Sequence, residues 1–239
     1  MTFSIILSDE PVVLFGAGAV SDADIEVVRG LSGPRVAADG GARIATAAGL
    51  DLHAVIGDFD SLSADDLKGI PSDRQHRIKE QDSTDFDKAL RHITAPVVVA
   101  VGFLGGRFDH QLACLHVLAT YPERPCLLLG PEEVVLLCPP VLDLETRPGD
   151  VVSLFPLGAV QGQSSGLRWP IEGLAFDPLT TIGTSNQAEG PVRLEMSAPR
   201  MVVIAPRRCL QSAMQALVHA PRSAQWPAHA GQYRDLRQS

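Results

Sequence analysis

The sequence has few cysteines, no long apolar run and no basic leader. Its 239 residues include 4 cysteines, which form no CxxC pair and no zinc-like spacing, so we expect buried reduced thiols rather than disulfides. No apolar run approaches the roughly 18 residues that a membrane-spanning helix needs. No charged and apolar targeting segment opens the chain. We therefore expect a cytoplasmic protein that makes no membrane contact.

Several familiar signatures are also absent. The formal net charge is -8, and no block of Lys and Arg interleaves with aromatic residues, which argues against a nucleic-acid partner. The chain has no GxxxxGK[ST] phosphate loop and no GxGxxG fingerprint. The letters GxSxG occur at Gly162-Gln163-Ser164-Ser165-Gly166, but within a region of strand-like runs and not on the strand-to-helix turn that a nucleophile elbow needs. These absences disfavour a dinucleotide-dependent oxidoreductase and acyl transfer, and leave metal-assisted phosphoryl transfer as the predicted chemistry.

Residues 1–130 alternate apolar, strand-like runs with helical patterns. Such alternation predicts a parallel sheet covered by helices. The expected strands are 12–15, 35–38, 53–57, 96–101 and 126–129, and the expected helices are 22–31, 41–48, 63–68, 84–93 and 108–119.

The pattern changes after Gly130-Pro131. Residues 131–206 contain strand-like runs separated by Pro and Gly, which predict an all-β unit, either a sandwich or a small barrel. The expected strands there are 134–137, 151–155, 171–174, 192–196 and 201–204. Residues 207–239 form an extension in which we expect a helix over 207–218, followed by a tail from 221 that is mobile or lies on a neighbour.

Aspartates follow two of the predicted strands. Asp39 precedes Gly40-Gly41 at a helix start, which suits either a tight cap or close approach to a ligand. Asp58 and Asp60 are two residues apart on an extended segment, so their side chains point the same way. Like charges about 4 Å apart repel by about 4 kcal/mol at an effective dielectric near 20. Mg²⁺ is the cation that best offsets such repulsion, whereas a solvated acidic turn is the alternative.

Two further segments carry polar residues at helix starts. Asp85 follows Thr84, so it serves either as a metal ligand or as a helix-start charge, and Gln81 lies just upstream. Gly105-Gly106-Arg107 follows a central strand and suits contacts with phosphate. Asp109 and His110 open the next helix, where a dipole-favoured charge and a structural histidine are the alternatives.

Taken in order, these motifs resemble the thiamine pyrophosphokinase family. The segments are Asp39-Gly40-Gly41-Ala42, Gly57-Asp58-Phe59-Asp60-Ser61, Gln81-Asp82-Ser83-Thr84-Asp85-Phe86, Gly105-Gly106-Arg107-Phe108-Asp109-His110, Gly166-Leu167-Arg168-Trp169-Pro170 and Thr184-Ser185-Asn186. The resemblance implies a Rossmann-like α/β domain followed by a β-sandwich domain, working as a homodimer with active sites at the subunit interface. It also implies transfer of the diphosphate of ATP to the hydroxyl of thiamine, giving thiamine diphosphate and AMP.

The resemblance also implies roles for individual residues. Asp39, Asp58, Asp60 and Asp85 would form a Mg²⁺ and ATP cluster, and either Asp85 or Asp58 would accept the hydroxyl proton. Arg107 and Asp109 would border the phosphates and the substrate. Residues expected to contact ATP or substrate are Gly40, Gly41, Gln81, Thr84, Gly105, Gly106 and His110, with Ser185 and Asn186 from the partner subunit holding the thiamine pyrimidine.

The sequence departs from the family pattern at three places. Arg43 replaces the usual asparagine, Cys114 stands where asparagine is frequent, and Pro199-Arg200-Met201 lacks a late tryptophan. Two alternatives therefore remain open: diphosphate transfer to another alcohol, such as a hydroxymethyl-pterin, and a non-catalytic nucleotide or thiamine sensor. From repulsion within the cluster, we expect Asp58→Asn to remove activity while relieving strain in the metal-free protein.

Overall fold

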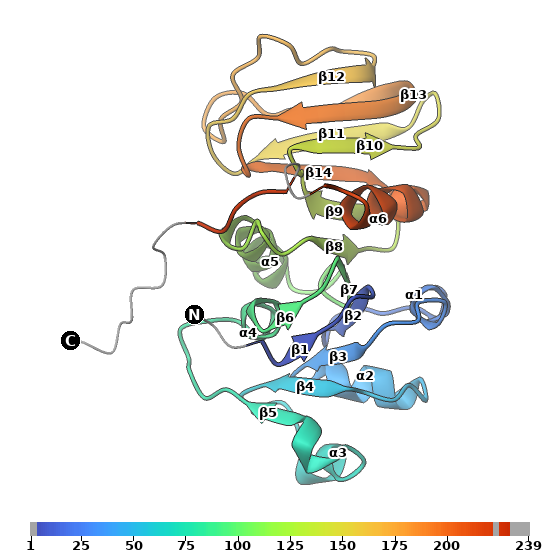
Figure 1. Cartoon of the computed structure of the whole chain (residues 1–239), viewed down its shortest axis with the longest axis vertical. Helices are drawn as coiled ribbons and strands as arrows, with labels where there is room; N and C mark the ends of the chain where they lie inside the picture. The colour runs from blue at the N-terminus through green and yellow to red at the C-terminus, as the bar shows by residue number, and fades with distance from the viewer. Residues whose placement is uncertain (1–3, 222–224, 230–239) are drawn as a thin grey trace, which may run out of the picture.

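One long mixed sheet runs through the protein in the computed structural model, which describes residues 4–221 and 225–229 (Figure 1). Its first half is a set of parallel strands in the order β8-β7-β2-β3-β4-β5. These strands are β2 (Val12–Phe15), β3 (Arg35–Ala38), β4 (Ala54–Gly57), β5 (Gln75–Arg77), β7 (Val98–Val101) and β8 (Cys126–Leu129). Every residue of β2, β4, β7 and β8 is buried, as both faces of a covered parallel sheet require.

Helices cover both faces of the parallel strands. Alternate strand residues pack with α4 and α5 on one face, and the others pack with α1 and α2 on the opposite face. The helices are α1 (Asp22–Arg29), α2 (Gly41–Ala47), α3 (Ala64–Lys68), α4 (Asp85–Arg91) and α5 (Phe108–Thr120). A short parallel pair, β1 (Ile6–Leu7) with β6 (Ile93–Thr94), lies outside the main sheet. The predicted α/β organisation of the first half is thus confirmed.

The second half continues the same sheet with antiparallel strands. The strand β9 (Glu133–Leu137) pairs antiparallel with β8, so the hydrogen-bonded ladder crosses the predicted boundary at Gly130-Pro131 without a break. The remaining strands are β10 (Val141–Leu144), β11 (Val151–Pro156), β12 (Gly162–Leu167), β13 (Gly183–Met196) and β14 (Met201–Pro206). The long strand β13 pairs with β11 through its first residues and with β10 and β12 through its later ones.

One predicted strand in this half is wrong. Residues 171–174 form a turn, closed by a bond from the Leu174 amide to the Ile171 carbonyl, rather than a strand. Ile171 is nevertheless buried in the core that the antiparallel strands form. The run looked like a strand in the sequence because it contains two apolar residues, Ile171 and Leu174, but the structure buries Ile171 from within a turn.

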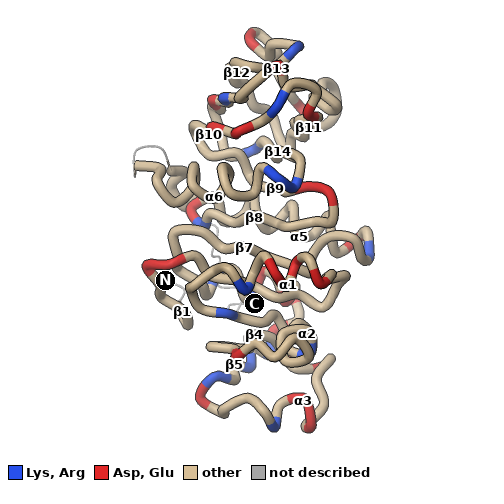
Figure 2. Tube along the Cα trace, turned by 90° about the vertical axis from the view of Figure 1, so that its right-hand side faces the viewer, with Lys and Arg blue, Asp and Glu red and all other residues tan. Residues whose placement is uncertain are grey.

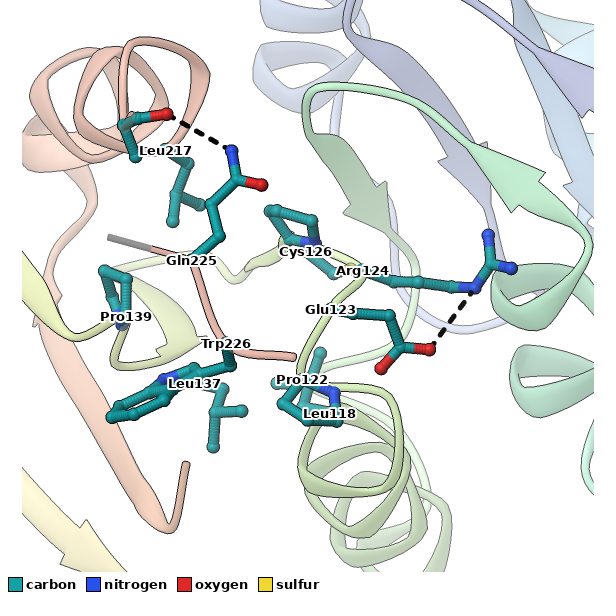
Figure 3. A pocket seen from close by; sticks show the side chains of 12 residues that line it. Leu118, Pro122, Glu123, Arg124, Cys126, Leu137, Pro139, Leu217, Gln225 and Trp226 are labelled. Atoms are coloured by element: carbon teal, nitrogen blue, oxygen red, sulfur yellow. Dashed lines mark hydrogen bonds and ion pairs between the residues drawn. The ribbon is translucent and has the colours of Figure 1, made fainter. Parts of the chain in front are cut away.

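The C-terminal extension begins with the expected helix. A 3-10 turn, η2 (Arg207–Cys209), leads into α6 (Leu210–Val218), which packs on β10 and β8. In the described part of the tail, Trp226 lies between α6 and α5 near Leu217 and Leu118, beside a small cavity of about 20 Å³ (Figure 3). The Trp226 indole donates a hydrogen bond of 2.8 Å to the Cys138 carbonyl. Residues 222–224 and 230–239, which the tail prediction includes, lie outside the described residues.

Charge and thiol placement follow the sequence expectations. Lys and Arg are scattered along both halves of the trace rather than gathered on one element (Figure 2). All four cysteines are buried and unpaired. Within residues 4–221 and 225–229, the helices are all too short or too polar to cross a membrane. The cytoplasmic location stays a prediction.

Gly41 gives a test of the close contact between α2 and the sheet. A Cβ at Gly41 would lie 2.1 Å from the Phe15 carbonyl oxygen, which is backbone and cannot move aside. We therefore expect Gly41→Ala to lower the free energy of unfolding by about 2–3 kcal/mol in urea titrations. Gly69→Ala is the matched control, since Gly69 has helical φ and open space around its Cβ position. Equal stabilities for the two variants would contradict the described contact.

Candidate metal and nucleotide site

The pairing of β3 with β4 brings the first two aspartates together. The Asp39 amide donates to the Ile56 carbonyl at 2.9 Å, so the residue after β3 stands beside the end of β4. Asp58 and Asp60 follow β4 directly. Carboxylate oxygens of Asp39, Asp58 and Asp60 all lie within 4.8 Å of one another. The structure therefore gathers three of the four predicted cluster aspartates at the carboxyl edge of the sheet, where open α/β sheets bind ligands.

The backbone at this edge is strained in two places. Asp39 has φ 39° and Phe59 has φ 65°, both in the left-handed region that favours glycine. Each such residue costs about 1–3 kcal/mol and persists only where its surroundings impose it. A Cβ on Gly57 would lie 2.9 Å from the Asp39 Cβ, so only glycine allows the two strand ends this close. Strain held at a cluster of like charges favours a functional site over a solvated turn.

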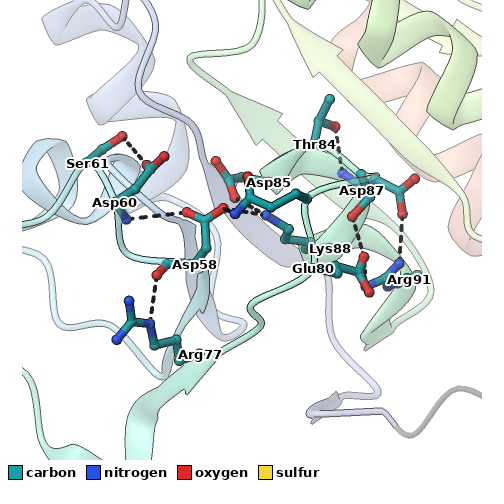
Figure 4. Close-up of polar contacts among 12 residues, drawn as sticks. Asp58, Asp60, Ser61, Arg77, Glu80, Thr84, Asp85, Asp87, Lys88 and Arg91 are labelled. Atoms are coloured by element: carbon teal, nitrogen blue, oxygen red, sulfur yellow. Dashed lines mark hydrogen bonds and ion pairs between the residues drawn. The ribbon is translucent and has the colours of Figure 1, made fainter. Parts of the chain in front are cut away.

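A buried lysine that sequence analysis missed lies against the cluster (Figure 4). The Lys88 side chain is 2% exposed, and its ammonium lies 2.8 Å from Asp58 Oδ2 and 3.2 Å from Asp85 Oδ1. The hydrogen bond from Lys88 lowers the pKa of Asp58 despite partial burial. Burial opposes the charge on Lys88, but its bonds to the two carboxylates raise its pKa overall. Lys88 thus supplies part of the positive charge that is needed to offset the repulsion among the aspartates.

The start of α4 and the segment before it also reach the site. They contribute Gln81, Thr84 and Asp85. The Gln81 amide donates to Asp58 Oδ2 at 3.3 Å. Thr84 caps α4, its side chain accepting from the Asp87 amide. Asp85 does not belong to the three-carboxylate group, and burial raises its pKa although Lys88 acts in the opposite direction. Asp85 therefore lies beside the cluster, and Lys88 links it to Asp58.

Arg43, one of the departures from the family pattern, braces the acidic loop. Its guanidinium donates to the Ser61 carbonyl at 2.8 Å and lies 3.8 Å from the Asp66 carboxylate. It thereby ties α2 to the loop that carries Asp58 and Asp60 and to the start of α3. The substitution is compatible with the acidic site because Arg43 contacts the backbone of the loop rather than its carboxylates.

The three-carboxylate group fits a divalent cation. Asp39 is 2% exposed, and its Oδ1 is buried with no hydrogen-bond partner in the part of the chain that the structure describes. An unpartnered buried carboxylate oxygen costs free energy unless a donor or a cation satisfies it. Carboxylate oxygens are the hard ligands that Mg²⁺ prefers. The donor set therefore fits Mg²⁺, with Asp39, Asp58 and Asp60 as the residues able to hold it.

The glycine-rich loop after β7 lies at the point where the sheet order reverses. The strands β2 and β7 are neighbours, and the Gly18 amide donates to the Gly102 carbonyl at 2.8 Å. Gly105 has φ 76°, and its amide is 3.3 Å from the Gln111 side chain. Crevices at such a reversal commonly accept nucleotides.

Arg107, Asp109 and His110 stand exposed at the start of α5. The Arg107 guanidinium pairs with the Asp109 carboxylate at 2.6 Å, with both side chains more than half exposed. This bond raises the pKa of Arg107 and lowers that of Asp109. Arg107 and Asp109 therefore orient each other, and both side chains are accessible to a ligand.

Ser185 and Asn186 lie far from the acidic cluster within one chain. They belong to β13, at the opposite end of the long axis from β4 (Figure 1). The Asn186 amide donates to the Trp169 carbonyl at 2.8 Å, and its oxygen accepts from the Trp169 amide at 3.3 Å. Ser185 has φ 59°, a third strained non-glycine residue. Within the chain, Asn186 thus holds the Trp169 backbone in place.

Comparisons with known proteins point to one family. A family model described as "Thiamin pyrophosphokinase, catalytic domain" matches residues 32–128. Thiamine pyrophosphokinase 1 of Arabidopsis thaliana is 32% identical over 152 residues, which cover 54% of this chain and 56% of that protein. Thiamine pyrophosphokinase 2 of the same plant is 31% identical over 123 residues, covering 45% and 46%. The chain thus spans about half the length of the curated relatives it matches.

Solved structures agree in fold. Thiamin pyrophosphokinase from Geobacillus thermodenitrificans superposes with a TM-score of 0.70 at 24% identity, covering 84% of this chain and all of that one. The Candida albicans enzyme gives 0.68 at 16% identity, covering 85% of this chain and 95% of that one.

The fold and the site define a mixed α/β protein with a carboxylate site at the carboxyl edge of its parallel strands. Residues 32–128, the part of the chain that matches the thiamin pyrophosphokinase catalytic-domain model, contain the acidic cluster. The resemblance drawn from the sequence motifs is confirmed.

Lys88 reverses the expected effect of Asp58→Asn on stability. Removing the Asp58 charge leaves a buried ammonium with Asp85 as its one remaining ion-pair partner among the described residues. We expect Asp58→Asn to lower the free energy of unfolding by about 1–3 kcal/mol at pH 7 without added metal. Because the folded pKa of Asp58 is lowered, its contribution is present above the unfolded pKa of about 3.9 and is lost as pH falls towards the folded value.

Urea unfolding of both proteins at pH 7 and at a pH below 4 measures this effect. The difference between wild type and variant should shrink at the lower pH. Asp65→Asn is the control, since Asp65 also pairs with a lysine, Lys68, but is 84% exposed. We expect the control to change stability by less than about 0.5 kcal/mol. A stabilised Asp58→Asn protein would show that repulsion among the carboxylates outweighs the pair with Lys88.

Proposed function

We propose that this chain is a thiamine pyrophosphokinase, which transfers the diphosphate of ATP to the hydroxyl of thiamine and releases AMP. The observation that carries the proposal is the group of Asp39, Asp58 and Asp60 with an unsatisfied Asp39 oxygen, inside the segment that matches the catalytic-domain family. Phosphoryl-type transfer depends mainly on positioning and on charge neutralisation, which this edge of the sheet can supply.

The site residues divide the work by position. Asp39, Asp58 and Asp60 would hold Mg²⁺, which when bound neutralises phosphate charge. Arg107 would bind phosphate oxygens at the exposed start of α5, and the backbone of Gly105 and Gly106 would allow close approach. Gln81 orients Asp58 through its amide. The residues that would border ATP and the substrate are Asp39, Gly40, Gly41, Thr84, Asp109 and His110.

Asp85 is the proposed acceptor of the thiamine hydroxyl proton. It lies outside the three-carboxylate group, and its side chain is 36% exposed, so a substrate hydroxyl can reach it. Asp58 is less suited to this role because Lys88 and Gln81 already occupy Oδ2. A carboxylate placed within hydrogen-bond reach of a substrate hydroxyl is sufficient for general-base assistance.

We further propose that the parallel half is a Rossmann-like nucleotide domain and that the antiparallel half is a β-sandwich domain that binds thiamine. Ser185 and Asn186 would then reach the acidic cluster of a second copy, because β13 lies at the far end of its own chain (Figure 1). Exposed apolar side chains near this end, including Trp169 at 53% and Leu179 at 92%, would be covered by such a contact. A homodimer with shared active sites follows.

The activity is tested by AMP release from ATP and Mg²⁺, with and without thiamine, with the mass of the product determined. We expect thiamine-dependent AMP and thiamine diphosphate in equal amounts. Asp60→Asn should lower kcat at least about hundredfold, since Asp60 is an exposed member of the metal-binding group. AMP release that does not depend on thiamine, with no thiamine diphosphate, would overturn the proposal.

Sharing of the site between subunits is tested by mixing two impaired variants. Asp60→Asn and Asn186→Ala damage different parts of one site, so a mixed dimer holds one site with both changes and one with neither. Random exchange of subunits in a C2 dimer should restore about one quarter of wild-type activity.

Each variant mixed with itself is the control and should stay impaired. If the mixture gains no activity although subunit exchange is demonstrated, Asn186 does not belong to a shared site. Its bonds to Trp169 would then be its whole role.

A further inference from the structure

Lys88 is a buried lysine next to the carboxylate cluster. It is one of the largest fully buried side chains, although it ends in an ammonium group. It bridges two elements: Asp58 on the loop after β4 and Asp85 one turn earlier on α4. The neighbouring Asp39 is also buried, with an unsatisfied oxygen. A buried cation is therefore built into a cluster that is otherwise suited to a divalent cation.

The charge balance shows what this arrangement does. The three carboxylates of Asp39, Asp58 and Asp60 and the neighbouring carboxylate of Asp85, together with Lys88, give the site a formal charge of about -3 instead of -4. A bare divalent ion entering the cluster meets the ammonium and must share Asp58 with it. A complex of the same ion with a nucleotide also brings phosphate charge, which the carboxylates repel and the ammonium attracts.

We propose that Lys88 is a positioning residue that makes the acidic site take a divalent cation together with a nucleotide's phosphates rather than alone. It does so in two ways that act in the same direction. Its charge opposes a free ion and favours phosphate, and its two bonds engage Asp58 Oδ2 and Asp85 Oδ1, so that these oxygens are not free to close around a bare ion. The role rests on the proposed function only in taking a nucleotide as the ligand.

The experiment measures two affinities in the absence of thiamine. Binding of free Mn²⁺ and of the Mn²⁺ complex of a non-hydrolysable ATP analogue is followed by electron paramagnetic resonance and by calorimetry. For Lys88→Met, which keeps the apolar stem and removes the charge, we expect free Mn²⁺ to bind about tenfold more tightly and the complex about tenfold more weakly. A purely structural role of Lys88 would weaken both.

Matched variants separate charge from shape. Lys88→Gln keeps a donor for Asp58 without the charge and should shift the two affinities in the same opposite directions. Lys88→Arg keeps the charge and should restore the wild-type ratio. Lys68→Met removes an exposed lysine that pairs with Asp65 at 2.6 Å, and it should change neither affinity.

The outcomes distinguish this proposal from the proposed function. Folded Lys88→Met and Lys88→Gln proteins with an unchanged ratio, or with both affinities reduced, would overturn the role of Lys88. So would loss of folded protein in both variants, because Lys88 would then serve the fold. A shifted ratio in a protein without thiamine-dependent AMP release would retain the role of Lys88 and reject the activity.

Discussion

The hydrogen-bonded register of β3 against β4 is the constraint on which the site depends. It sets the Asp39 amide on the Ile56 carbonyl and thereby places one aspartate beside the loop that carries two more. Two features permit this close approach: positive φ at Asp39 and Phe59 turns the backbone to suit the cluster, and Gly57 leaves room for Asp39. Lys88 offsets part of the resulting repulsion with its positive charge.

Much of the fold could be predicted from hydrophobic patterning alone. The strands 12–15 and 126–129 begin and end where the sequence indicated, because fully buried parallel strands read as unbroken apolar runs. The strand β12 was missed because its residues, Gly162 to Leu167, are mostly glycine and polar. It forms because the long partner β13 offers a ladder, not because of its own propensity. The short β5 likewise owes its pairing to β4.

The site was predicted in part for a related reason. Strand-end aspartates can be found in a sequence because the topology of a parallel sheet brings them to one edge. Lys88 could not be found in this way, since a lysine in an amphipathic helix usually marks the solvent face. Only the packing of α4 against β3 and β4 turns that position inward, towards Asp58 after β4. Arg43, conspicuous in the sequence as a departure, proves to brace the acidic loop.

The unbroken ladder from β7 through β8 and β9 to β14 has a mechanical consequence. Two units joined only by a loop can rotate relative to each other, whereas two units that share consecutive strands of one sheet move together as one rigid body. Opening a cleft between the halves of one chain would require breaking rows of backbone hydrogen bonds. Any closure of this chain around a bound ligand must therefore come from loops at the strand ends.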